Sequence, residues 1–261
     1  MGRADDEPLA GSRLVVVTGG GKGIGRAIVR HFASLGDRVI AIARDESALL
    51  GTTEELRADG REVAYEVCDV TVEGSVAALF ERLGAVDVLI NNAGTSTSAP
   101  VHRATLDEWN RQIAVNATGA FLCTRAVLPS MNDRDRGRIV FVASTAGVVG
   151  HPYTAGYVAS KHAEVGLMRA VAAEVAGTGI TANAVCPTFV RTEMTDRSIE
   201  RIVQKTGRTV DEAREALASS SPLKRLLEPD EIGVVTAFLA SPEAAAINGQ
   251  VLVMDGGGIQ R

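Results

Sequence analysis

Short apolar runs alternate with longer stretches of helical spacing along almost the whole chain, and this alternation constrains the fold more than any other feature. We predict seven strands, at residues 13–18, 38–43, 62–67, 86–90, 138–142, 180–185 and 251–254. Helical patterns lie between them, including those at 25–35, about 105–128 and about 155–176. Strands that are apolar throughout are typical of a parallel sheet with helices on both faces. With right-handed crossovers, the pattern predicts a doubly wound α/β sheet.

The length and composition indicate one domain. At 261 residues with 46% hydrophobic content, the chain can bury a large core, and no linker-like break in composition divides it. We therefore predict a flexible tail at 1–12 and a single Rossmann-type domain at 13–261. Residues from about 192 to 221 are charged and amphipathic, and we interpret them as a mobile flap over a site.

Charge and cysteine usage exclude several classes of function. The net charge is −5 with acids and bases interspersed, which argues against a nucleic-acid surface. The first dozen residues lack an apolar leader and no later run could span a bilayer, so no membrane association is expected. The cysteines (Cys68, Cys123 and Cys186) and the four histidines lack metal-ligand spacing, so we expect no metal site and a cytoplasmic location.

A glycine-rich turn, Thr-Gly-Gly-Gly-Lys-Gly-Ile-Gly at 18–25, joins the first predicted strand to the first helix. Glycine permits positive φ angles and a close approach of the backbone, and a helix N-terminus offers unpaired N–H groups to a phosphate. The turn therefore predicts a dinucleotide pyrophosphate site that includes Gly19, Gly23, Ile24 and Gly25. Its spacing is Gly-x-x-x-Gly-x-Gly, not the Gly-x-Gly-x-x-Gly of common dehydrogenases.

Tyr157 and Lys161 lie four residues apart within a predicted helix, so their side chains share one face. A free tyrosine has a pKa of about 10, and a cation beside the phenol favours the phenolate, which moves a tyrosine toward a useful acid–base range. Hydride transfer to a ketone leaves a developing alkoxide, which needs a hydrogen-bond donor and then a proton. Ser144, at the carboxyl end of the fifth predicted strand, is suited to hold that oxygen, and Tyr157 to donate the proton.

Together with Asn-Asn-Ala-Gly at 91–94 and with Asn116, these motifs resemble those of the classical short-chain dehydrogenase/reductase family, over residues 14–257. Ser144 stands thirteen residues before Tyr157, as the resemblance requires. The resemblance implies an NAD(P)H-dependent oxidoreductase that interconverts a ketone and a secondary alcohol. It also implies that Lys161 holds the nicotinamide ribose hydroxyls and that Asn116 holds a water in a proton relay to the lysine.

The resemblance assigns further residues to the cofactor. The adenine should lie against Asp69 and Val70, the adenosine ribose against Asn91, Ala93 and Gly94, and the nicotinamide and pyrophosphate under Pro187 to Thr192, with the Val190 backbone on the carboxamide. Thr188 stands where the family usually has glycine, which would either tilt the flap or narrow the nicotinamide pocket.

The end of the second predicted strand indicates which nicotinamide cofactor is used. Ala43 stands where NAD-preferring relatives carry an acid, and Arg44 follows it, with a guanidinium suited to a phosphate. Lys22, inside the glycine turn, resembles the second basic residue of NADP-preferring members. We therefore predict NADP(H), with NAD(H) as the alternative if Asp45 binds the ribose 2′-hydroxyl.

The sequence constrains the substrate less, because a fold does not fix it. From the resemblance we predict a small-molecule carbonyl or alcohol substrate, either a 3-oxoacyl thioester or a related cyclic or bulky ketone. One alternative is an NAD-dependent dehydrogenase of a small hydroxy acid or alcohol, which Ser96, Ala146 and Thr154 disfavour at the positions where such relatives bind a carboxylate. Nucleotide-sugar epimerases or dehydratases usually carry Gly-x-x-Gly-x-x-Gly, and non-catalytic NADP-binding regulators typically lose the serine, tyrosine or lysine.

The resemblance also implies an assembly. Relatives pair the helices that correspond to about 105–128 and 155–176 across one twofold axis and the last strand across another. We therefore predict a homotetramer.

Overall fold

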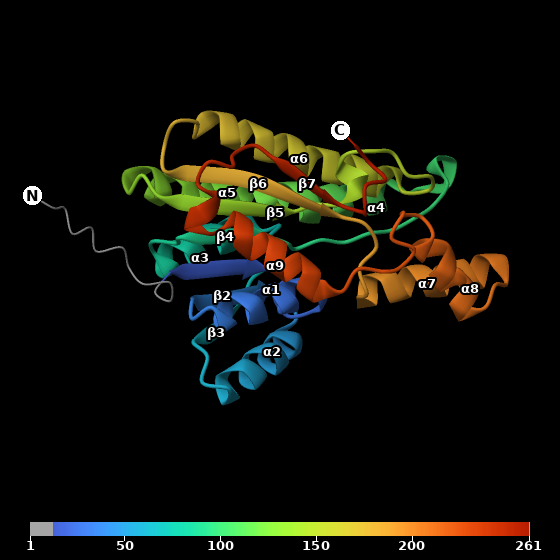
Figure 1. Ribbon diagram of the computed structural model, residues 1–261, viewed down its shortest axis with the longest axis horizontal. Coiled ribbons are helices and arrows are strands. Elements are labelled where there is room, and N and C mark those ends of the chain that lie inside the picture. Colours follow the sequence, from blue (N-terminus) through green and yellow to red (C-terminus); the bar gives the residue numbers. More distant parts are fainter. Residues whose placement is uncertain (1–12, 261) are drawn as a thin grey trace, which may run out of the picture.

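The computed structural model describes residues 13–260, which form one seven-stranded parallel sheet in the order β3-β2-β1-β4-β5-β6-β7, with helices on both faces (Figure 1). The tail predicted at 1–12 and the last residue lie outside the described residues. The strands are β1 (Leu14–Thr18), β2 (Arg38–Ala43), β3 (Val63–Val67), β4 (Val88–Asn91), β5 (Gly137–Val142), β6 (Ile180–Pro187) and β7 (Val251–Met254). The prediction of a doubly wound parallel sheet is confirmed.

The helices follow the predicted alternation. They are α1 (Gly23–Ser34), α2 (Glu46–Ala58), α3 (Glu73–Leu83), α4 (Leu106–Gln112), α5 (Gly119–Asp133), α6 (Ala155–Glu174), α7 (Glu193–Thr206), α8 (Val210–Ala218) and α9 (Pro229–Leu239). Single 3₁₀ turns lie at η1 (Val101–Arg103), η3 (Thr145–Gly147) and η4 (Pro242–Ala244), and η2 (Ile113–Thr118) is π-helical.

The one continuous helix predicted at 105–128 is wrong in detail. The chain instead forms α4, the π-helical segment η2 and then α5, which runs on to Asp133. Asn116 of η2 bonds to Thr95, which lies outside the helix, at 2.8 and 2.9 Å. A π-helical turn holds an additional residue, and such turns occur often at functional sites. Apolar periodicity does not reveal a tertiary contact of this kind.

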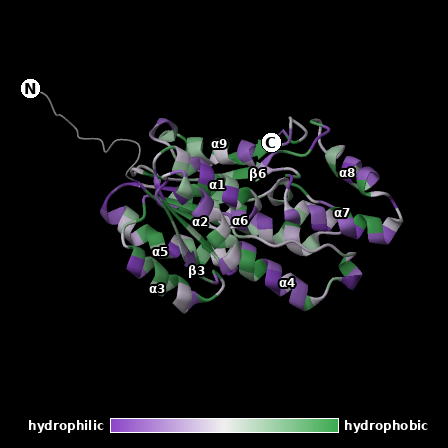
Figure 2. Cartoon of the chain, turned by 90° about the horizontal axis from the view of Figure 1, so that it is seen from below, coloured by the Kyte–Doolittle hydropathy of each residue, from purple (hydrophilic) through white to green (hydrophobic). Residues whose placement is uncertain are grey.

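Alternate residues of each strand face opposite sides of the sheet, so the sheet carries two hydrophobic cores. Val16 of β1 faces the core shared with α3, α5 and α6, whereas Val15 faces the core shared with α1, α2 and α9. Phe141 is fully buried in the first core and Phe32 in the second, and truncating either to alanine costs about 3–5 kcal/mol. Figure 2 shows hydrophobic residues along the strands and hydrophilic residues on the outer helix faces.

The carboxyl ends of the strands meet at one edge of the sheet because all the strands are parallel. The strand order reverses at β1, which has β2 on one side and β4 on the other. Such a point leaves a crevice beyond the carboxyl ends, where ligands bind in open α/β sheets. The glycine turn after β1 and the loops after β4, β5 and β6 all begin at this edge.

The segment predicted as a flap consists of α7 and α8, which Figure 1 shows projecting away from the sheet. Thr192 caps α7, because its side chain accepts a bond from the Thr195 N–H. Gly207, with a φ of +71°, ends α7, and a capping box between Thr209 and Glu212 begins α8. The helical pattern of 192–221 is therefore divided into two short helices.

Two further facts bear on the exclusions drawn from the sequence. Between residues 13 and 260, the structure has no helix long and apolar enough to cross a membrane, and no group of three or more metal-ligating side chains. The three cysteines are buried and free.

Candidate functional site

The glycine turn is fixed at its start and uncapped where α1 begins. Gly19 has a φ of +69°, and its N–H donates to the Ile42 carbonyl at 2.7 Å. A Cβ on Gly25 would lie 2.1 Å from the Gly19 carbonyl oxygen, so only glycine fits there. Lys22 is the N-cap of α1 but makes no side-chain cap bond, and the first turn holds no acid. The first N–H groups of α1, including those of Gly23 and Ile24, can therefore bind an anion such as a pyrophosphate.

The loop after β4 is bonded directly to the glycine turn. The Thr18 hydroxyl oxygen accepts the N–H groups of Asn92 and Ala93, each at 2.9 Å, and the Asn92 amide donates to the Thr18 carbonyl at 2.8 Å. The Asn91 side chain instead points into the protein and donates to the Thr124 hydroxyl in α5 at 2.9 Å. Asn92, the neighbour of the predicted Asn91, is thus the side chain that joins the two loops.

Asn116 connects the loop after β4 to α6. Its Oδ1 accepts the Thr95 N–H at 2.8 Å, and its Nδ2 donates to the Thr95 carbonyl and to the Ser160 hydroxyl at 2.9 and 2.8 Å. Ser160 in turn donates to the Tyr157 carbonyl at 2.8 Å. The fully buried Asn116 amide therefore sets the distance between this loop and the turn of α6 that carries Tyr157.

Lys161 is buried on α6, and its ammonium has two protein partners. It donates to the Val142 carbonyl at 3.0 Å and to Glu164 Oε2 at 2.6 Å. Burial opposes its charge, but the nearby Glu164 and Tyr157 outweigh this effect and raise the pKa of Lys161. Gly94 lies beside the ammonium, since a Cβ there would stand 3.8 Å from the lysine nitrogen. The remaining donor of the ammonium has no protein partner among the described residues.

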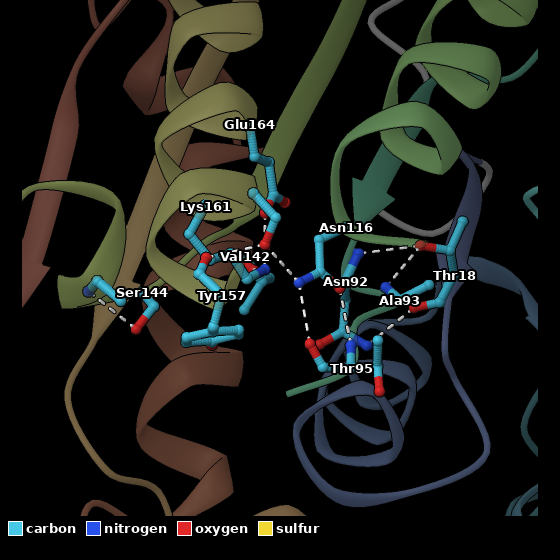
Figure 3. A network of polar contacts seen from close by, with 12 residues as sticks. Thr18, Asn92, Ala93, Thr95, Asn116, Val142, Ser144, Tyr157, Lys161 and Glu164 are labelled. Atoms are coloured by element: carbon cyan, nitrogen blue, oxygen red, sulfur yellow. Dashed lines mark hydrogen bonds and ion pairs between the residues drawn. The ribbon is translucent and has the colours of Figure 1, made fainter. Parts of the chain in front are cut away.

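Ser144 lies at the end of β5 with an extended φ of −175°. Its Oγ accepts the Ala146 N–H at 3.1 Å, which leaves its own O–H as a donor. Figure 3 shows the Tyr157 ring between Ser144 on one side and Asn116 on the other, with Lys161 one turn further along α6. The structure thus brings the four predicted catalytic residues to one place at the carboxyl edge.

Both bases predicted to hold a phosphate have acidic partners. Lys22 lies 2.9 Å from Asp45 and 3.9 Å from Glu193, and Arg44 lies 3.6 Å from Asp69. The bond from Lys22 lowers the pKa of Asp45 to about 2. Asp45 also caps α2 by accepting the Ala48 N–H. Its carboxylate therefore has structural partners in the protein already.

The two residues predicted against the adenine differ in their surroundings. Asp69 accepts the N–H and the hydroxyl of Thr71 at 2.9 and 2.7 Å. Val70 is buried against Gly119 of α5, where a Cβ would lie 2.7 Å from a methyl of Val70.

The start of the flap lies against the glycine turn. Beyond β6, which ends at Pro187, Val190 bridges to Leu227 in parallel. The methyl of Thr192 would lie 3.1 Å from a Cβ on Gly23. Thr192 therefore sits directly over the N-terminus of α1.

A second contact joins α7 to the loop after β4. Arg201 Nη1 donates to the Ser98 hydroxyl at 2.8 Å. Thr188, the residue that departs from the expected glycine, bonds through its N–H to the Met254 carbonyl at 3.1 Å. The flap is thus held at its base and along α7.

Three residues of this site were not among the predicted site residues: Thr18, Asn92 and Glu164. Thr18 and Asn92 are next to the predicted Gly19 and Asn91. The sequence does not show which of two adjacent side chains the backbone directs into the protein. Glu164 follows Lys161 by three residues, a spacing that places both side chains on one helix face. That spacing was the available signal.

Comparisons with known proteins agree with this arrangement. A profile described as short chain dehydrogenase matches residues 13–202. A protein of Streptomyces violaceoruber named as a ketoacyl reductase of the granaticin polyketide synthase is 40% identical over 254 residues, covering 95% of this chain and 93% of the relative. The 3-oxoacyl-(acyl-carrier-protein) reductase FabG of Vibrio harveyi is 36% identical over 246 residues, covering 94% and 96%.

A solved structure is also similar over nearly its full length. The F189W variant of actinorhodin polyketide ketoreductase, crystallised with NADPH, superposes with a TM-score of 0.89 at 39% identity. The match covers 94% of this chain and 97% of that one.

Proposed function

Because the chain belongs to the short chain dehydrogenase family and is an oxidoreductase, we propose that it interconverts a ketone and a secondary alcohol with NADP(H). One observation carries the proposal: Tyr157 shares a face of α6 with the buried ammonium of Lys161, beside Ser144 at the end of β5. Ketone reduction needs a proton donor, a cation to assist it and a donor to the oxygen, and these three side chains supply them.

Each side chain has a role in the proposed reaction. The Ser144 O–H donates to the substrate oxygen, since its oxygen already accepts the Ala146 N–H. The Tyr157 phenol gives its proton to the developing alkoxide in reduction and takes it back in oxidation. Lys161 stabilises the phenolate that forms. Asn116 Oδ1 accepts one bond, from Thr95, and can accept a second from a water that relays protons to Lys161.

The cofactor would lie along the carboxyl edge and, when bound, would supply or accept the hydride. The N-terminus of α1 fits its pyrophosphate, and the free donor of Lys161 fits a ribose hydroxyl. Arg44 and Lys22 would hold a 2′-phosphate. The presence of NADPH in the actinorhodin ketoreductase structure supports the same choice of cofactor.

We propose a 3-oxoacyl thioester or a related cyclic or bulky ketone as the substrate. The names of the granaticin and Vibrio relatives support this class. The test is NADPH oxidation over a panel of 3-oxoacyl thioesters, bicyclic ketones and small keto acids, with the Tyr157→Phe variant as the blank. Turnover of thioesters or bulky ketones supports the proposal, and turnover of small keto acids alone contradicts it. NADPH binding without any turnover would indicate a regulator.

Exposed apolar side chains support the proposed homotetramer. Leu106 and Trp109 of α4 and Phe121 of α5 are exposed on the helices expected at one twofold axis. Val234 and Phe238 of α9 are exposed as well, and β7 is an edge strand of the sheet. Exposed apolar groups of this kind mark interaction surfaces. The proposed compartment is the cytoplasm, which suits free and buried cysteines.

A further inference from the structure

Glu164 is a buried carboxylate that the proposed reaction does not use. It lies on α6, three residues after Lys161, and its side chain is 1% exposed. Its carboxylate oxygen accepts a hydrogen bond from the Lys161 ammonium at 2.6 Å (Figure 3). Among the described residues, Lys161 is the only side chain to which Glu164 is hydrogen-bonded. Burying a charge is costly unless the charge is paired. Removing either partner would therefore leave the other as an uncompensated buried charge.

The geometry fixes the lysine nitrogen. Of the three N–H donors of an ammonium, one goes to the Val142 carbonyl and one to Glu164. These partners come from β5 and from the next turn of α6. The third donor has no protein partner among the described residues and is left for Tyr157 and the cofactor ribose, which we expect beside it.

The electrostatics of the pair depend on Glu164. Burial alone would lower the pKa of Lys161, and the attraction of Glu164 is the largest effect that opposes it. Burial likewise raises the pKa of Glu164 to about 7 against the attraction of Lys161. The other titratable groups that face the pair are Tyr157 on α6 and Cys186 on β6, whose thiol pKa burial raises to about 11. From β5 and η2 the facing groups are neutral: the Val142 carbonyl and Asn116.

We propose that Glu164 is a positioning residue: it holds the Lys161 nitrogen in place and keeps it protonated at alkaline pH, so that the ammonium continues to assist Tyr157. The catalytic part of this proposal rests on the proposed function. The effect on the charge of Lys161 does not, and it can be measured without substrate or cofactor.

The chain offers a direct measurement because it contains only four lysines: Lys22, Lys161, Lys205 and Lys224. Protein labelled with ¹³C at lysine Cε gives four signals, and the one missing in Lys161→Met is that of Lys161. In Glu164→Gln, which keeps the size and one oxygen acceptor, this signal should titrate at a pH at least one unit lower than in the unmutated protein. One unit is a tenfold loss of proton affinity, and buried lysines can lose up to about 3–5 units.

Activity gives the second readout. In alcohol oxidation, kcat/KM of Glu164→Gln should fall at the alkaline end of the pH profile, where the unmutated enzyme stays active. Glu164→Asp keeps the negative charge but holds it one methylene further from the ammonium, so it should restore only part of the alkaline activity. Glu174→Gln removes an exposed carboxylate from the end of the same helix and should change neither readout.

The outcomes separate the two proposals. If the Lys161 signal titrates at the same pH in Glu164→Gln as in the unmutated protein, the inference about Glu164 is refuted, whatever happens to activity. If Tyr157→Phe stays active, the proposed function fails, and the lysine titration still decides the role of Glu164. If Glu164→Gln does not fold, the titration of Glu164→Asp decides: with its carboxylate one methylene shorter, an unchanged lysine pKa refutes the close contact.

Discussion

Replacing Arg44 by alanine tests how the enzyme would select its cofactor. Arg44 follows β2 at the carboxyl edge, where the 2′-phosphate of NADPH is expected. A hydrogen bond to a charged group contributes about 1.5–3 kcal/mol. The Arg44 side chain is 69% exposed, so solvent screens the bond and we take the lower end of this range. Arg44→Ala should therefore weaken NADPH binding about 10-fold and leave NADH binding nearly unchanged.

The partners of Lys22 add a second, finer expectation. Lys22 is already bonded to Asp45 at 2.9 Å, so a phosphate would have to compete with that carboxylate. Lys22→Ala should cost only about 2- to 5-fold in NADPH affinity, as is usual for exposed pairs. Asp45→Asn should do the opposite and tighten NADPH binding, because it frees Lys22 and removes a like charge from the phosphate.

The assay is fluorescence titration of NADPH and NADH, with kcat/KM measured for both. Arg30→Ala is the matched control. Arg30 is an exposed arginine of α1 that pairs with Asp230, and it is not among the residues expected to bind the cofactor. Equal losses for NADPH and NADH in Arg44→Ala would refute the reasoning. Equal kcat/KM for the two cofactors in the unmutated enzyme would show that Asp45 governs the ribose pocket.

Three more outcomes are expected. Tyr157→Phe should lower kcat by about 10²–10⁴-fold with NADPH affinity nearly unchanged, because the ring stays and only the proton donor is removed. In steady-state kinetics, a kcat above about a tenth of the wild-type value would count against this role. Asp87 is held ionised: burial opposes its charge, but the Leu14 N–H and Arg134 outweigh this effect and lower its pKa. Asp87→Asn should thus reduce the free energy of unfolding by about 1–3 kcal/mol at pH 7. A lowered pKa contributes stability that is lost as pH falls, so urea denaturation at about pH 3 should show a smaller difference; an equal difference at both pH values would contradict the assignment. Light scattering at micromolar concentration should give about four times the 27.3 kDa chain mass, and a monomer would refute the tetramer.

The sequence predicted the sheet because its signal repeats along the whole chain. The strands are mostly apolar along their length, which is typical of a parallel sheet covered on both faces. The glycine turn was recognisable for a local reason: Gly19 has a positive φ, and a Cβ on Gly25 would lie 2.1 Å from the Gly19 carbonyl oxygen. These are constraints that a residue and its near neighbours in the sequence reveal.

What the sequence did not reveal depends on contacts between distant segments. The pairing of Lys22 with Asp45 joins two loops at the carboxyl edge, and nothing in either loop indicates it. Of the adjacent Asn91 and Asn92, the end of β4 decides which one turns inward. The interruption of the helix at Asn116 has the same origin, since the bond to Thr95 spans 21 residues.

The π-helical segment η2 also limits how this chain can change over evolutionary time. Such a segment amounts to one residue inserted into a helix. Because each residue turns an α-helix by about 100°, deleting one here would rotate α5 by that angle relative to α4. Leu122 and Met131, which are buried in the core, would then be turned out of their present places in it. Losing the insertion would therefore require one side of the core to be rebuilt at the same step.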